Sequence, residues 1–174
     1  LILFSTKVLL YYYTTSMIAK ISKGSGFDGC LRYNLDKAKG HLIDTNMDIS
    51  KGASPTKLAT QFRDYSKLND NCKKPVLHIP ISFSKKDNLT EEQMKQAALM
   101  FLERFETKMN GGIKPEGSRP YVIIRHTDTD HQHLHIITSR VDSQGKVLKD
   151  SNDYKEANSI CRELEKELGL DIVN

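Results

Sequence analysis

The chain has 174 residues and a mass of 19.8 kDa, enough for one domain with its own hydrophobic core. Its hydrophobic content of 38% and charged content of 28% are ordinary for a globular protein. The formal charge of +4 and a pI near 8.9 permit a polyanionic partner without requiring one. The three cysteines have no CxxC spacing, which argues against a disulfide framework or a zinc knuckle and favours the reducing cytoplasm.

The first sixteen residues differ in composition from the rest of the chain. They are apolar and aromatic, yet too short and too interrupted for a membrane span. They also lack the charged start and the cleavage site of a signal peptide. We expect residues 1–16 to be a non-native leader or a disordered extension, with the native protein beginning at Met17, which mass spectrometry of the N-terminus would test.

A strand, a glycine-rich turn and a helix are predicted after Met17. Residues 17–22 alternate as a strand does, and the glycines of residues 24–29 indicate a turn before a helical run to Lys37. On a helical wheel the apolar stripe contains Phe27 and Leu31, and Tyr33 lies roughly 140° from the centre of that stripe. Tyr33 is therefore not an obvious core residue.

The segment around Tyr33 is also basic. A tyrosine in a basic setting suits chemistry on a phosphate group, whereas a half-exposed tyrosine without a special role is the plain alternative. The segment alone favours the plain alternative. Its basic residues are Lys20, Lys23, Arg32, Lys37 and Lys39.

The middle of the chain predicts a helix and then a strand. Ser54-Pro55 has the pattern of a helix N-cap and first helical residue. Residues 75–83 read as a strand in which His78 and Ser82 share a face. Pro80 within that run predicts an edge strand or a bulge. His78 is equally consistent with a site residue and with a structural histidine.

Two further helices are predicted as scaffold. Residues 90–93, Thr-Glu-Glu-Gln, form a capping box before a long apolar stripe that stops at Gly111-Gly112. A last helix begins at Asn152 or Asp153 and ends at Gly169.

The most informative stretch is a hairpin that contains four of the six histidines. Residues 121–125 and 131–141 are predicted strands, and the polar residues between them are a predicted turn. His131, His133 and His135 then share one face, and His126 joins them if it lies opposite His131 or, slipped by two, opposite His133. Three or four converging imidazoles predict a metal site with an open coordination position. Asp128 and Asp130 fit either outer acceptors or turn residues.

The order of elements is strand, helix, helix, strand, helix, strand hairpin, helix. This order predicts an α+β fold, a two-layer domain with a largely antiparallel sheet. We expect the helices on one face of the sheet and the histidine metal site on the other.

With these motifs in place, the chain resembles the relaxase, or mobilisation nuclease, family of conjugative and mobilisable elements, a His-hydrophobic-His endonuclease class. The resemblance covers about residues 17–170. Three stretches carry it in order: RYNLDK at 32–37, LHIPISF at 77–83 and HTDTDHQHLH at 126–135.

The resemblance implies strand-specific DNA nicking at an origin of transfer. Tyr33 would attack a phosphodiester and keep the 5′ phosphate as a phosphotyrosine, with Asp128 as orienter or proton acceptor. The expected metal ligands are His126, His133 and His135. Additional metal or DNA contacts are expected from His131, His78 and Ser82. The expected phosphate-binding residues are Lys20, Lys23, Arg32 and Lys37.

The expected cofactor is one divalent ion. Family habit and availability in cells favour Mg or Mn, whereas three imidazoles favour Zn, Ni or Cu in vitro. The expected partners are single-stranded DNA, accessory mobilisation proteins and a coupling protein. Residues 17–174 would be the catalytic domain, and relaxases usually continue into further domains. Two other functions stay open: a metal-dependent phosphodiesterase that activates water, and a non-catalytic DNA-binding domain with a structural metal.

Overall fold

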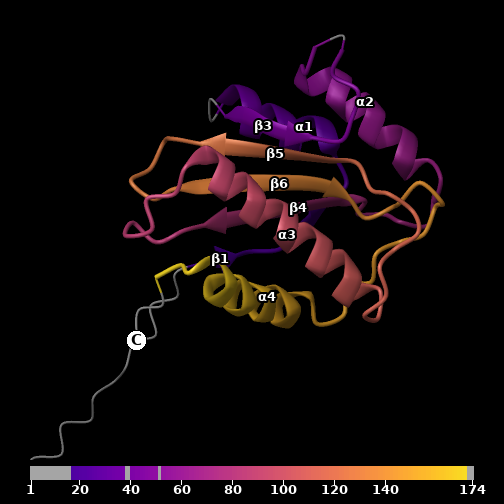
Figure 1. The fold of residues 1–174 in the computed structure, drawn as a ribbon. Helices are drawn as coiled ribbons and strands as arrows, with labels where there is room; N and C mark the ends of the chain where they lie inside the picture. Colours follow the sequence, from indigo (N-terminus) through magenta and orange to yellow (C-terminus); the bar gives the residue numbers. More distant parts are fainter. Residues whose placement is uncertain (1–16, 38–39, 51, 172–174) are drawn as a thin grey trace, which may run out of the picture.

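A computed structural model of the protein describes residues 17–37, 40–50 and 52–171. The predicted leader, residues 1–16, lies outside the described residues. Within the described part of the chain, six strands form one sheet in which every pairing is antiparallel (Figure 1). The order across the sheet is β1-β4-β6-β5-β3, and β2 also pairs with β4. The strands are β1 (Ile18–Ala19), β2 (Ser22–Gly24), β3 (His41–Thr45), β4 (Val76–Ser82), β5 (Tyr121–His126) and β6 (His133–Ser139).

The helices begin where the sequence predicts. The Ser54 side chain accepts a hydrogen bond from the Lys57 N–H, and Thr90 with Gln93 forms a complete capping box. None of the described helices combines the length and apolar content needed to cross a membrane. The helices are α1 (Phe27–Arg32), which continues into the π-helical turn η1 (Tyr33–Lys37), α2 (Pro55–Ser66), α3 (Glu91–Met109) and α4 (Asp153–Leu168).

The α+β class and the antiparallel sheet are confirmed, and α3 and α4 cover the face opposite the histidines, as predicted. Figure 1 shows α3 crossing in front of the sheet with α4 beside it. Their apolar stripes pack against alternate strand residues that include Ile79, Ile123 and Ile136. These residues point away from the histidines because side chains alternate along a strand.

The histidine face is also covered in part, which the two-layer prediction did not include. A second apolar cluster joins α1 and α2 to Val122, Ile124 and Ile137 of the sheet. The rings of Phe27 and Phe62 stack within it at 4.5 Å between centroids. The apolar half of this face needs a cover to be removed from water, so two helices pack there and leave the polar half to the histidines.

The prediction of an edge strand or a bulge at Pro80 is wrong. β4 lies inside the sheet, between β6 and the pair β1 and β2. The Pro80 carbonyl accepts from the Lys20 N–H at 3.0 Å, so the missing N–H of Pro80 also faces that neighbouring strand. The neighbouring strand is interrupted at this point, with Ala19 opposite Ile81 and Ser22 opposite His78 in unchanged register.

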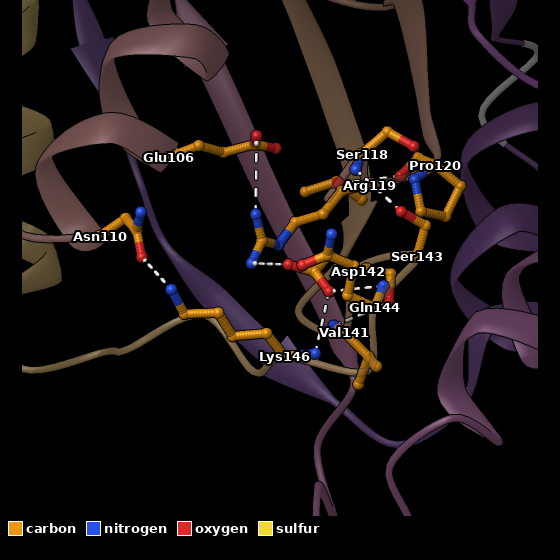
Figure 2. Close-up of polar contacts among 12 residues, drawn as sticks. Glu106, Asn110, Ser118, Arg119, Pro120, Val141, Asp142, Ser143, Gln144 and Lys146 are labelled. Atoms are coloured by element: carbon orange, nitrogen blue, oxygen red, sulfur yellow. Dashed lines mark hydrogen bonds and ion pairs between the residues drawn. The ribbon is translucent and has the colours of Figure 1, made fainter. Parts of the chain in front are cut away.

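A buried ionic cluster lies next to the start of β5, the strand that ends at His126 (Figure 2). The Arg119 side chain is 2% exposed and donates to the Asp142 carboxylate at 3.4 Å, with Glu106 3.7 Å from its other terminal nitrogen. Asp142 also accepts from the N–H groups of Gln144 and Lys146, both at 2.9 Å. The cluster thus fastens the loop before β5 to α3 and to the turn after β6.

We expect the Asp142→Leu variant to lose about 3–5 kcal/mol in free energy of unfolding, because it leaves Arg119 as a buried charge without its main partner. Urea denaturation followed by circular dichroism measures this. The matched control is Glu103→Gln, which breaks an exposed ion pair with Lys114 and should leave the stability nearly unchanged. Equal stability of the two variants would contradict the role assigned to the cluster.

Candidate metal centre

The pairing of β5 with β6 brings three histidines together. His126 lies directly opposite His133, and Ile124 lies opposite His135. Of the two predicted registers, the one slipped by two is therefore the observed one. The candidate ligand atoms of His126, His133 and His135 all lie within 4.8 Å of one another. The three histidines predicted as ligands therefore lie close enough together to hold a metal ion.

Each ring of this triad has one nitrogen held by another protein group. His126 is buried, and its Nε2 donates to the backbone carbonyl of Asn34 at 2.9 Å. His133 Nδ1 lies 3.0 Å from the carbonyl oxygen of His131, to which it donates. An imidazole fixed in this way through one nitrogen presents the other as a ligand. The nitrogens left for an ion are therefore Nδ1 of His126 and Nε2 of His133.

The hydrogen bond between His126 and Asn34 requires a glycine at position 40, where the backbone passes close to both groups. A Cβ added to Gly40 would lie 2.1 Å from the Asn34 carbonyl oxygen and 2.9 Å from His126 Nε2. Side chains do not make contacts this short, so a residue without a Cβ is required where the backbone passes this hydrogen bond. The absence of a side chain at Gly40 thus makes room for the hydrogen bond that orients His126 in the candidate metal centre.

Burial lowers the pKa of three clustered rings, His78, His126 and His135. Burial, followed by the nearby imidazoles, lowers the pKa of His135 to about 3. Burial and His126 lower the pKa of His78 to about 4. The pKa of His126 is also lowered, chiefly by burial. At neutral pH these rings therefore keep the lone pair that a metal ligand needs.

The donor set fits a divalent ion with an open position. Three imidazoles from two strands are the ligands of a catalytic rather than a sealed site. Asp128, half exposed in the hairpin loop, has its Oδ1 3.3 Å from His133 Nε2. Asp130 instead pairs with Lys85 at 3.3 Å. Of the two aspartates, Asp128 is thus the one that reaches the triad, and it faces the His133 nitrogen left for an ion rather than an outer nitrogen.

The remaining predicted contacts lie around the triad. His78 Nε2 is 2.8 Å from His135 Nδ1. Ser82 lies opposite His133 in the pairing of β4 with β6. His131 precedes β6, which begins at His133 rather than at the predicted residue 131. Its side chain is exposed and outside the triad, and its carbonyl helps to hold His133.

Tyr33 is the first residue of η1 and is 59% exposed, so it does not belong to the core. The residue that follows it, Asn34, is buried and provides the carbonyl that holds His126. The backbone beside Tyr33 is thereby bonded directly to a candidate metal ligand.

The predicted phosphate-binding cations are in different environments. Lys20 is exposed, and the side chain of Lys37 lies outside the described residues. Lys23 is paired with Asp153 at 2.6 Å and with Asp150 at 3.2 Å. Arg32 Nε donates to Asp28 at 2.7 Å.

Sequence reasoning missed Asn34 and Gly40 as parts of the centre. Asn34 acts through its main-chain carbonyl, which any residue has, so its side chain gave no signal. Gly40 follows the segment 32–37 closely, but a glycine after a helix is usually read as a stop. Only the approach of this backbone to a strand far away in sequence reveals its role.

We expect Gly40→Ala to weaken binding of Mn²⁺ and Zn²⁺, because the added methyl group displaces the carbonyl that orients His126. Isothermal titration calorimetry measures the affinity. Gly29→Ala is the control, because a Cβ there meets nothing within 4 Å. An unchanged affinity in Gly40→Ala would exclude this role of the Asn34 carbonyl.

We expect His133→Ala to lower the metal affinity by at least about 100-fold, since removing a ligand should exceed the usual effect of losing an outer partner. His131→Ala is the matched control, because this ring is exposed and outside the triad. The same titrations test both variants. Equal losses in the two would mean that the ion binds elsewhere.

Comparison with known proteins agrees with this geometry. The model of the family described as Relaxase, MobA/VirD2-like, nuclease domain, matches residues 33–170, which begin at Tyr33 and include the whole histidine hairpin. No curated protein matches the chain. Because the matched region is most of the chain, this protein belongs to the family of MobA/VirD2-like relaxases, of which it contains the nuclease domain.

Proposed function

We propose that the protein nicks one DNA strand at an origin of transfer by transesterification, with Tyr33 as the nucleophile. Membership of a relaxase nuclease family supports DNA nicking in general. Tyrosine attack, the site at an origin of transfer and the covalent intermediate are the parts that we add. Accessory mobilisation proteins and a coupling protein are the partners that this reaction would require in plasmid mobilisation.

One observation carries the proposal: the hydrogen bond from His126 Nε2 to the carbonyl of Asn34. It joins a candidate metal ligand to the residue that directly follows Tyr33. The same turn is π-helical, a conformation that occurs frequently at functional sites. A phenol that must meet both a metal-bound phosphate and a DNA strand from solvent needs an exposed position in a segment that contacts the centre.

The proposed reaction exchanges one phosphodiester for another. The bond from Tyr33 Oη to phosphorus forms while the bond from phosphorus to the 3′ oxygen breaks. The phenolic proton passes to a base, for which we propose Asp128, and the leaving 3′ oxygen takes up a proton from solvent to become a hydroxyl. The DNA keeps its 5′ phosphate on Tyr33, so the step is reversible.

The centre would supply what the phenol lacks. With an ordinary pKa of about 10, tyrosine is mostly protonated at neutral pH and is a weak nucleophile. An ion held by His126, His133 and His135 would withdraw charge from a phosphate oxygen and orient it for attack. We propose Mg or Mn as the ion in cells, with Zn, Ni or Cu also binding three imidazoles in vitro.

DNA binding would use groups around the triad. We propose that Lys20, Lys23, Arg32 and Lys37 neutralise phosphates, and that His131 and Ser82 contact the strand near the scissile bond. The exposed hairpin loop leaves His131 accessible to a ligand. Phosphate contacts of this kind weaken as salt concentration rises.

We expect Tyr33→Phe to abolish a covalent protein–DNA adduct, because it removes only the attacking oxygen. The protein is incubated with Mn²⁺ and labelled single-stranded oligonucleotides that cover the DNA flanking its own gene, and the products are separated on a denaturing gel. Tyr154→Phe is the control, because Tyr154 is exposed to the same degree, 60% against 59%. The control variant should still form the adduct.

Other products would identify another function. Free cleaved DNA with both the wild type and the Tyr33→Phe variant would point to a phosphodiesterase that activates water. Salt-sensitive binding without cleavage in any metal would point to a DNA-binding domain with a structural ion. Either result would overturn tyrosine transesterification.

A further inference from the structure

Beside the triad, a row of hydrogen-bonding groups crosses three strands. Ser22 of β2 lies directly opposite His78 of β4, and His78 lies diagonally across from His135 of β6, whose direct partner is Pro80. Side chains at diagonal positions on one face of a sheet are within reach of each other when they are long. His78 Nε2 is 2.8 Å from His135 Nδ1, and His78 Nδ1 is 3.4 Å from the Ser22 hydroxyl.

The 2.8 Å contact joins two ring nitrogens, so it has to have one donor and one acceptor. If His78 donates, Nδ1 of His135 is the acceptor, and the neutral ring of His135 then carries its proton on Nε2. That tautomer offers no lone pair at Nε2. If His135 donates instead, Nε2 is free to bind an ion. The direction of this single hydrogen bond therefore decides whether His135 is a ligand.

The groups behind His78 favour the second direction. A ring that accepts at Nε2 carries its own proton on Nδ1, which then faces the Ser22 hydroxyl oxygen. The Ser22 hydroxyl can in turn donate to the His78 carbonyl, 3.3 Å away. In this arrangement each donor of the row faces an acceptor. The opposite direction would need Ser22 to donate to Nδ1 and give up the carbonyl.

We propose that His78, supported by Ser22, is a positioning residue that holds His135 in its metal-binding tautomer. His78 itself lies outside the group of three that could share an ion. The inference rests on the metal centre used in the proposed function and goes beyond the contact expected of His78 there.

The choice of histidine has a chemical consequence. Outer partners of ligand histidines are often carboxylates, which add a negative charge next to the ion. His78 is a neutral acceptor, because a doubly protonated ring would place a donor against the donor of His135. The ion therefore keeps more of its positive charge for a phosphate oxygen. A carboxylate at this position should bind metal more tightly and activate phosphate less.

The test compares three variants of the full chain: His78→Leu, which removes the acceptor, His78→Gln, which keeps an amide oxygen as acceptor, and His78→Glu, which adds charge. Zn²⁺ affinity is measured by calorimetric competition without DNA. We expect His78→Leu to lose about 10- to 100-fold in affinity. His78→Gln should remain within a few-fold of the wild type, and His78→Glu should bind more tightly.

A second readout reports the tautomer directly. Long-range ¹H–¹⁵N spectra of the zinc-loaded wild type should show His135 protonated on Nδ1 and bound through Nε2. A purely structural role for His78 would lower the thermal midpoint of the metal-free variants without moving the affinity or this signature. His135 bound through Nδ1, or wild-type affinity in His78→Leu, would overturn the proposal.

The two proposals can fail separately. A wild type that binds Zn²⁺ with the expected signature but forms no DNA adduct would overturn the proposed function and support the role of His78. A wild type that binds neither Zn²⁺ nor Mn²⁺ would overturn the inference about His78, because His135 would then not be a metal ligand.

Discussion

The pairing of β5 with β6, in the register that sets His126 opposite His133, is the constraint on which the centre depends. A slip of one residue would turn His133 and His135 to the opposite face, into the core under α3 and α4. Two apolar clusters hold the register. Ile123 and Ile136 belong to one face, and Ile124 and Ile137 to the other, so a slip of one residue would move residues of β6 out of the clusters in which they pack.

The local features were predictable because each is determined by residues close together in the sequence. The His-x-His row, the capping box at Thr90 and the helix start at Ser54 each depend on residues within a few positions, and all three are present. The packing of α1 and α2 on the histidine face was not predictable in this way. A helical stripe shows that a helix is covered, but not which face of a sheet covers it.

The outer partners of the triad were the least predictable part. They are the main-chain carbonyls of Asn34 and His131 and the ring of His78, and a carbonyl leaves no trace in a sequence. These three partners carry no negative charge, whereas the Asp128 carboxylate lies 3.3 Å from His133 Nε2, on the side left for an ion. Imidazoles held from behind by uncharged groups suit a task in which the ion has to attract an anionic backbone, since those groups cancel little of its charge.

The ion pairs of Lys23 and Arg32 have a consequence for how a nucleic acid would be held. A cation that is already paired with a carboxylate in the free protein has to exchange that partner for a phosphate. The exchange frees a carboxylate that then attracts cations from solution, which offsets part of the release of condensed counterions from the DNA. The logarithm of the binding constant should therefore fall less steeply with the logarithm of salt concentration than the number of basic residues suggests. Affinity would then depend more on shape and on contacts with bases.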